Sequence, residues 1–198
     1  MIGKQMALVC RTRGVAVLAS TRSSKTPGPG QFFLDLTTPN SADQLPDGDG
    51  PIVILAALTG YKECDAMPAL AAMVNVDAPV NLARAALNAG RRVVFVSSSS
   101  VFGGDIPNCR EDDPVKPQAV YSAQKAETEQ HLRSLPNWNS LGVVVRLTKV
   151  LAPNTAPLPA WRKALAGGES DFTFRRHDFF AHLTSVCCAQ LNRNRFVA

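Results

Sequence analysis

The sequence has no long apolar run and no N-terminal segment of the kind that directs secretion. No hydrophobic stretch approaches the roughly 20 residues that a membrane-spanning helix needs. The first residues place Lys4 in a mixed stretch that soon reaches Arg11 and Arg13, which differs from the layout of a signal peptide. These features predict a cytoplasmic protein that does not act at a membrane.

Cysteine and histidine are too few and too scattered for a fold held by disulfide bonds or by a metal ion. The five cysteines are an odd number, show no CxxC spacing and are not joined by clustered histidines. Disulfide frameworks and structural zinc sites both require regular spacing. We therefore expect no metal site and reduced, mostly buried thiols at Cys10, Cys64, Cys109, Cys187 and Cys188.

Charge is moderate and basic residues do not gather into long runs. Charged residues make up 19% and hydrophobic residues 45% of the 198 residues, which is the composition of a globular domain with a core. The net charge of +5 suits an anionic small molecule. Nucleic-acid binding is not expected, because basic and aromatic residues do not alternate as they do in single-strand binders. A solvated basic surface explains the charge equally well.

Short β-branched runs alternate with helical patterns, which is typical of βα units around a parallel sheet. The expected strands cover residues 15–18, 32–34, 52–57, 93–96 and 142–147. The expected helices cover residues 3–13, 68–87, 119–135, 160–166 and 181–191. The pattern predicts an α/β fold with a doubly wound, Rossmann-like parallel sheet over residues 1–152. A partial, smaller lobe is expected over residues 153–198.

The predicted sheet starts in an unusual way. Doubly wound folds normally begin with a strand and a glycine-rich turn, whereas this sequence opens with a helical pattern. At the other end, Ala198 follows closely on an expected helix. We therefore expect a chain that lacks the first strand of the sheet and is truncated at both ends.

Tyr121 and Lys125 form the strongest chemical signal. Their spacing of four residues places both side chains on one face of the expected helix. A phenol ionises near pH 10 in water, and a nearby ammonium lowers that pKa, which favours proton transfer at neutral pH. Taken alone, this spacing also occurs in ordinary exposed helices.

A run of serines follows the strand expected at residues 93–96. Ser97 to Ser100 lie at the carboxyl end of that strand, where open α/β sheets bind their ligands. A hydroxyl there could hydrogen-bond the oxygen that reacts beside a tyrosine. The alternative is a polar turn, which Gly103 and Gly104 also favour, and the two interpretations are compatible.

Together these segments resemble a known family. The strand, then Ser97-Ser-Ser-Ser-Val-Phe-Gly103, then Tyr121-Ser-Ala-Gln-Lys125 resembles the extended short-chain dehydrogenases/reductases, which carry SS-x-x-V-[YF]-G ahead of Y-x-x-x-K. Ala56-Ala57, Cys64 and Val74-Asn75-Val76 resemble the dTDP-4-dehydrorhamnose reductase branch of this NAD-dependent epimerase/dehydratase superfamily. The resemblance implies that Ser98 is the catalytic hydroxyl, Tyr121 the acid/base and Lys125 its pKa-lowering, ribose-binding partner.

The resemblance also implies contacts with a dinucleotide cofactor. Members of the family open with G-x-x-G-x-x-G, of which this sequence keeps only the third glycine. The alternative interpretations are a strand-ending turn at Asp35, an ordinary loop arginine at Arg22 and simple packing of the small residues. The implied contacts are Gly3 at the pyrophosphate turn, Arg22 at a 2′-phosphate, Asp35 and Leu36 at the adenine, Ala56 and Ala57 at close backbone approach, and Thr148, Tyr121 and Lys125 near the nicotinamide and its ribose.

The implied reaction is hydride transfer between a nicotinamide cofactor, NADP or NAD, and a sugar carbon. Net 4-keto reduction of a nucleotide-linked sugar is the first hypothesis, and epimerase or dehydratase chemistry of the same superfamily is the next. A non-catalytic nucleotide-binding or regulatory protein that retains the fold is the alternative from another class. The resemblance further implies a homodimer that forms through helices such as the one expected at residues 119–135.

Overall fold

The computed structural model describes residues 2–23, 26–104, 108–148 and 150. Contacts divide the chain into a first unit that ends at Val144 and a second that begins at Val145. The lobe predicted over residues 153–198, with its two helices and with Cys187 and Cys188, lies outside the described residues.

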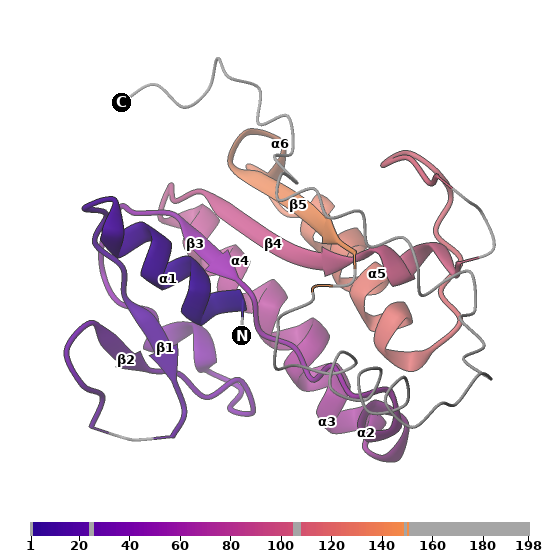
Figure 1. Cartoon of the computed structure of the whole chain (residues 1–198), viewed down its shortest axis with the longest axis horizontal. Helices are drawn as coiled ribbons and strands as arrows, with labels where there is room; N and C mark the ends of the chain where they lie inside the picture. Colours follow the sequence, from indigo (N-terminus) through magenta and orange to yellow (C-terminus); the bar gives the residue numbers. More distant parts are fainter. Residues whose placement is uncertain (1, 24–25, 105–107, 149, 151–198) are drawn as a thin grey trace, which may run out of the picture. The chain divides into compact units, whose positions relative to one another are not determined.

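Helices and short strands alternate along the first unit (Figure 1). The helices are α1 (Ile2–Thr12), α2 (Tyr61–Ala66), α3 (Pro68–Ala72), α4 (Ala78–Asn88), α5 (Val120–Arg133) and α6 (Trp138–Leu141), with 3₁₀ turns η1 (Ser41–Gln44) and η3 (Ser99–Phe102) and a π-helical turn η2 (Met73–Asp77). The strands are β1 (Ala19–Thr21), β2 (Gln31–Phe33), β3 (Ile52–Ile54), β4 (Val93–Ser98) and β5 (Gly142–Leu147).

The strands form two sheets with parallel pairing. β1 pairs with β2, and β3, β4 and β5 lie in that order in the second sheet. The β3–β4 pair is parallel, with Ile52 opposite Val93 and Ile54 opposite Phe95. Parallel strands need a crossover, and α2, α3 and α4 supply it between β3 and β4. The predicted α/β fold with parallel sheets is confirmed.

The core lies between the β3–β4 pair and the helices α4 and α5. Burial alternates along β4, so Val93 and Phe95 point into the core together with Ile54 of β3. Leu87 of α4 and Leu132 of α5 pack against them. Burying side chains of this size stabilises the fold by about 1.5–3 kcal/mol each. The core therefore holds α5 against the strand whose end carries the serines.

The other face of β3 is covered by α1. A Cβ added to Gly3 would lie 3.2 Å from Cδ1 of Leu55, the residue that follows β3, so helix and strand end approach closely. Figure 1 shows α1 in front of β3 and α4 behind it. Helices therefore cover both faces of this part of the sheet, as a doubly wound fold requires.

The strand predicted at residues 15–18 is wrong, because β1 begins at Ala19. Val15 and Leu18 are 53% and 56% exposed. The Ala19 amide donates to the Gly30 carbonyl, and pairing then continues through Thr21. Ser20 and Thr21, which lie beyond the predicted strand, are therefore strand residues. Pairing, rather than the apolar run, decides where this strand lies.

Two other boundaries differ from the prediction for physical reasons. β3 ends at Ile54 instead of residue 57, since the Leu58 backbone bonds the side chain of Asn75 rather than a neighbouring strand. The helix predicted over 68–87 is interrupted by the π-helical turn, where the Asn75 carbonyl accepts a bond from the Thr128 hydroxyl. Such outside partners commonly accompany irregular helix turns.

Among the described residues, no helix combines the length and the apolar character needed to cross a membrane. The cysteines that can be described, Cys10, Cys64 and Cys109, are free. Only Cys64 of these three is buried, so the expectation of mostly buried thiols is wrong for Cys10 and Cys109, which are half-buried. No cluster of three or more metal-binding side chains occurs in the part of the chain that the structure describes.

Candidate active site

Lys125 is fixed beneath the carboxyl end of β4. Its ammonium donates a hydrogen bond of 3.0 Å to the Val96 carbonyl and lies 4.5 Å from the centre of the Phe95 ring. The side chain is only 1% exposed. Burial lowers the pKa of Lys125 from its usual 10.5 to about 8, against the opposing charge of Glu129. One bond leaves two N–H donors of this ammonium for other partners.

The lowered pKa of Lys125 predicts a pH-dependent stability. Between pH 8 and 10.5 the unfolded chain holds the lysine proton and the folded chain releases it. The free energy of unfolding should therefore rise with pH in this window, by at most about 3 kcal/mol. Urea denaturation of the native chain and of Lys125→Met at several pH values isolates this effect, because other groups cancel in the difference. An identical pH dependence of the two proteins would contradict the buried, charged lysine.

Tyr121 lies one helical turn before Lys125 and packs against a second tyrosine. Its ring centre is 5.7 Å from that of Tyr61, with an interplanar angle of 64°, which is an edge-to-face contact. Burial raises the pKa of Tyr121 above 10, and the proximity of Tyr61 and Cys64 adds to the effect. The sequence predicted the opposite direction. The causes of this raised pKa do not include the Lys125 ammonium, which donates to the Val96 carbonyl.

Ser98 ends β4 and caps the following turn. Its hydroxyl oxygen accepts bonds from the Ser100 amide at 3.2 Å and the Ser100 hydroxyl at 2.9 Å. With its acceptor positions used in this way, the Ser98 hydroxyl keeps its proton for donation to a ligand oxygen. The serine turn and the candidate hydroxyl are thus both present. The hydroxyl of Ser97 is buried and has no hydrogen-bond partner within the described residues.

The three predicted catalytic residues come from two adjacent elements. Lys125 bonds the carbonyl two residues before Ser98, which ties α5 to the end of β4. Figure 1 shows α5 beside this strand end. Tyr121 also lies on α5, one turn before Lys125. The structure therefore ties the helix that carries the phenol and the ammonium to the end of the strand that carries the hydroxyl.

A buried amide network, which the sequence did not predict as part of the site, braces this arrangement. Asn75 is fully buried, and its side chain accepts from the Leu58 amide at 2.7 Å and donates to the Leu58 carbonyl at 3.1 Å. It also donates to Gln124, the neighbour of Lys125, at 2.8 Å. The sequence signal for this network was an amide side chain within an apolar helical pattern, because buried amides require hydrogen-bond partners.

The predicted adenine pair, Asp35 and Leu36, divides into two roles. The Asp35 carboxylate accepts bonds from the Thr37 amide at 2.9 Å and the Thr37 hydroxyl at 2.7 Å. Asp35 therefore closes a turn, which was the alternative interpretation of this residue. These bonds, more than the charge of Arg22, lower the pKa of Asp35. Leu36 instead faces a pocket between this turn and α4.

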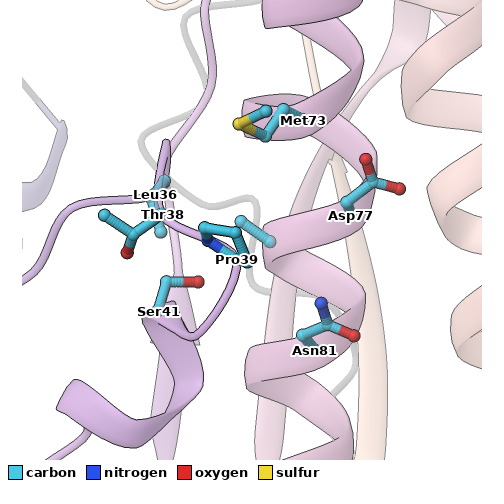
Figure 2. A pocket seen from close by; sticks show the side chains of 8 residues that line it. Leu36, Thr38, Pro39, Ser41, Met73, Asp77 and Asn81 are labelled. Carbon is cyan, nitrogen blue, oxygen red and sulfur yellow. The ribbon is translucent and has the colours of Figure 1, made fainter.

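The pocket beside Leu36 has a volume of about 260 Å³. Figure 2 shows the Ser41 hydroxyl directed toward the helix side, where Met73, Asp77 and Asn81 lie on one face. Ser41 is 1% exposed, and its hydroxyl has no partner among the described residues. The lining combines apolar walls with a few polar groups, which is typical of small-molecule sites. Its residues are Leu36, Thr38, Pro39, Ser41, Met73, Asp77, Ala78 and Asn81.

The other predicted cofactor contacts occupy separate positions. Gly3 lies in the first turn of α1, against Leu55. Ala56 and Ala57 are half-buried in the loop after β3, and Arg22 is exposed just after β1. Thr148 follows β5 and belongs to the second unit, so its position relative to Tyr121 stays a prediction.

Residues 1–166 match the family model described as the RmlD substrate binding domain. The chain belongs to this family. The match confirms the resemblance on which the motif interpretation rested.

Curated relatives agree with this assignment. A dTDP-4-dehydrorhamnose reductase from Streptomyces griseus is 31% identical over 150 residues, which cover 74% of this chain and 45% of that protein. A protein of the same name from Mycobacterium tuberculosis (strain H37Rv) is 32% identical over 101 residues, covering 48% of this chain and 33% of its own length. The chain thus spans between a third and a half of these reductases. Methionine adenosyltransferase 2 subunit beta from Bos taurus is 37% identical over 84 residues, covering 42% of this chain and 24% of that protein.

Solved structures share the fold. MoeE5 in complex with UDP-glucose and NAD superimposes with a TM-score of 0.66 and 29% identity, covering 84% of this chain and 58% of that one. A UDP-galactose 4-epimerase superimposes with a TM-score of 0.67 over 85% of this chain and 60% of that one, at 24% identity. The second likeness concerns the fold alone.

Proposed function

We propose that this protein is an NAD(P)-dependent oxidoreductase acting on a nucleotide-linked sugar, with reduction of a 4-keto group as its reaction. The observation that carries the proposal is the bond from Lys125 to the Val96 carbonyl, which ties the helix that carries Tyr121 to the strand that ends at Ser98. Family membership and the reductases among the relatives support the reaction class. MoeE5, a structural neighbour, is complexed with UDP-glucose and NAD, which supports the ligand classes.

Each side chain has a defined part in this proposal. Tyr121 is neutral at pH 7, since a phenol ionises near pH 10 and burial raises this pKa further, so it holds a proton to donate to the oxygen of the sugar carbonyl. Ser98 donates a hydrogen bond to the same oxygen. The spare N–H donors of Lys125 bind ribose hydroxyls. A nicotinamide cofactor, when bound, supplies the hydride.

The described residues fit a dinucleotide on its adenine side. Leu36 and Met73 give the pocket apolar walls, and the unpartnered Ser41 hydroxyl offers a hydrogen bond at its edge. A flat, mostly apolar ring with polar atoms on its rim matches this lining. We propose that the adenine binds here and that Arg22 contacts a 2′-phosphate, which would favour NADP over NAD. The cytoplasmic location and the homodimer stay predictions.

The pocket provides a direct binding test. Leu36→Arg fills the space with a long charged side chain and should weaken NADPH binding at least tenfold in a fluorescence titration. Leu8→Arg is the matched control, because Leu8 is 54% exposed on α1 and should tolerate the same change. Equal affinity of the two variants would remove the pocket from the cofactor site. Failure of the native chain to bind either NADPH or NADH would overturn the enzyme assignment.

A second candidate function has one specific observation in its favour. The similarity to methionine adenosyltransferase 2 subunit beta favours a regulatory subunit that keeps the fold. In that case nucleotide binding would persist without turnover, and replacement of Tyr121 would change neither property. Assays for NADPH oxidation with dTDP- and UDP-linked keto sugars separate the two functions.

A further inference from the structure

The two tyrosines of the chain lie in contact, although 60 residues separate them in the sequence. The chain contains only Tyr61 and Tyr121. Tyr121 is the proposed proton donor, whereas no role has been assigned to Tyr61. The edge-to-face contact with a centroid separation of 5.7 Å buries one part of the Tyr61 ring, but the residue remains 51% exposed. The exposed part of an aromatic ring therefore borders the site beside Tyr121.

The local structure holds Tyr61 in this position. Tyr61 is the first residue of α2, and Cys64, three residues later, is fully buried on the inner side of that helix. The Cys64 amide donates to the Gly60 carbonyl at 2.9 Å, and its thiol donates to the Leu58 carbonyl at 3.2 Å. Leu58 is in turn bound by Asn75. A short helix anchored in this way fixes the backbone position from which the Tyr61 ring extends to Tyr121.

We propose that Tyr61 is a positioning residue that fixes the ring of Tyr121, and that its exposed face forms an apolar wall for the sugar ring of the substrate. This inference rests on the proposed function, because it assigns a substrate contact to the same site. The C–H face of a sugar ring is an apolar surface, and aromatic side chains bury such surfaces with defined geometry. An edge-to-face partner also restricts the orientations of the Tyr121 phenol.

Shielding of Tyr121 is a second consequence of the contact. The raised pKa of Tyr121 comes first from burial and next from the proximity of Tyr61. Loss of the Tyr61 ring should expose the Tyr121 phenol to water and bring its pKa back toward 10. Replacement by Phe should keep most of the burial, because only the hydroxyl is removed.

The presence of only two tyrosines allows a measurement that needs no enzymatic activity. In Tyr61→Phe and in Tyr61→Leu, Tyr121 is the sole tyrosine, so ultraviolet titration of tyrosinate reports its pKa directly. We expect a higher pKa in the Phe variant than in the Leu variant. Equal pKa values in two folded variants would overturn the positioning role, whatever the outcome of the activity assays. Thermal unfolding checks that both variants are folded.

Steady-state kinetics test the substrate wall. Tyr61→Phe should retain the native KM for the keto sugar, and Tyr61→Leu should raise it about tenfold, with the Kd for NADPH unchanged. Met67→Ala is the matched control, because Met67 is 42% exposed at the other end of α2 and should keep the native KM. A native KM in Tyr61→Leu would overturn the proposal that the Tyr61 ring contacts the sugar. Absence of turnover in the native chain would instead overturn the proposed reaction, and the substrate wall with it, while the titration still tests the positioning of Tyr121.

Discussion

Tyr121→Phe is expected to lower turnover of the keto sugar by about 10²–10⁴-fold while leaving the Kd for NADPH nearly unchanged. The substitution removes one oxygen and its proton but keeps the ring that packs against Tyr61. The packing and the stability of α5 should therefore persist. The measurements are single-turnover rates with saturating cofactor and a fluorescence titration of NADPH.

The matched control for this prediction is Tyr61→Phe, which removes the same atom from the neighbouring ring. Because Tyr61 is not the proposed proton donor, its loss of a hydroxyl should change the rate by much less. If both variants turned over at the native rate, the proton would have to come from another group. If both lost activity equally, the effect could not be assigned to proton donation by Tyr121.

The sequence predicts the parts of the site that depend on local geometry. Spacing of four residues placed Tyr121 and Lys125 on one face of a helix, and α5 provides that helix. The position of the serines after a β-branched run predicted that they would stand at the end of a strand. β4 extends two residues further than expected and includes Ser98 itself. Both predictions use local signals, the spacing along a helix and the β-branched run of a strand, and such signals are complete within a short segment.

The sequence could not predict features that depend on contacts between distant segments. The direction of the Tyr121 pKa follows from burial and from Tyr61, which is remote in the sequence. The limits of β1 depend on pairing with residues twelve positions later, so the apolar run at 15–18 pointed to the wrong segment. The interruption of the helix at Met73–Asp77 depends on Thr128 of another helix. Tertiary contacts override local pattern in each case.

Asn75 shows why one such contact matters for the site. Its amide joins the loop after β3 to Gln124 of α5, and the Thr128 hydroxyl returns to its backbone carbonyl. The loop that carries Ala56 and Ala57 and the helix that carries Tyr121 are thus fastened to the same side chain. A buried polar network of this kind is stabilising only while all its members are satisfied.

Asn75→Ala is therefore expected to lower the free energy of unfolding by about 3 kcal/mol, or the melting temperature by about 10 °C. The substitution leaves the Leu58 amide and the Gln124 side-chain oxygen without their Asn75 partner in a buried region, while the Leu58 carbonyl keeps the Cys64 thiol as a donor. Each unsatisfied group costs about 1–3 kcal/mol, although some can turn to water. Denaturant titration and calorimetry give both values.

Asn81→Ala, in the helix α4 that directly follows the π-helical turn, is the control. Asn81 is half-buried, and among the described residues its side chain accepts one bond, from Arg84 at 2.9 Å in an exposed position. Its replacement should therefore change stability by no more than about 0.5 kcal/mol. The difference between the two variants measures the buried network, since both remove the same atoms from α4 or the turn before it. Equal stability of the two variants would mean that water replaces the Asn75 amide without cost. The loop and α5 would then be held by apolar packing alone.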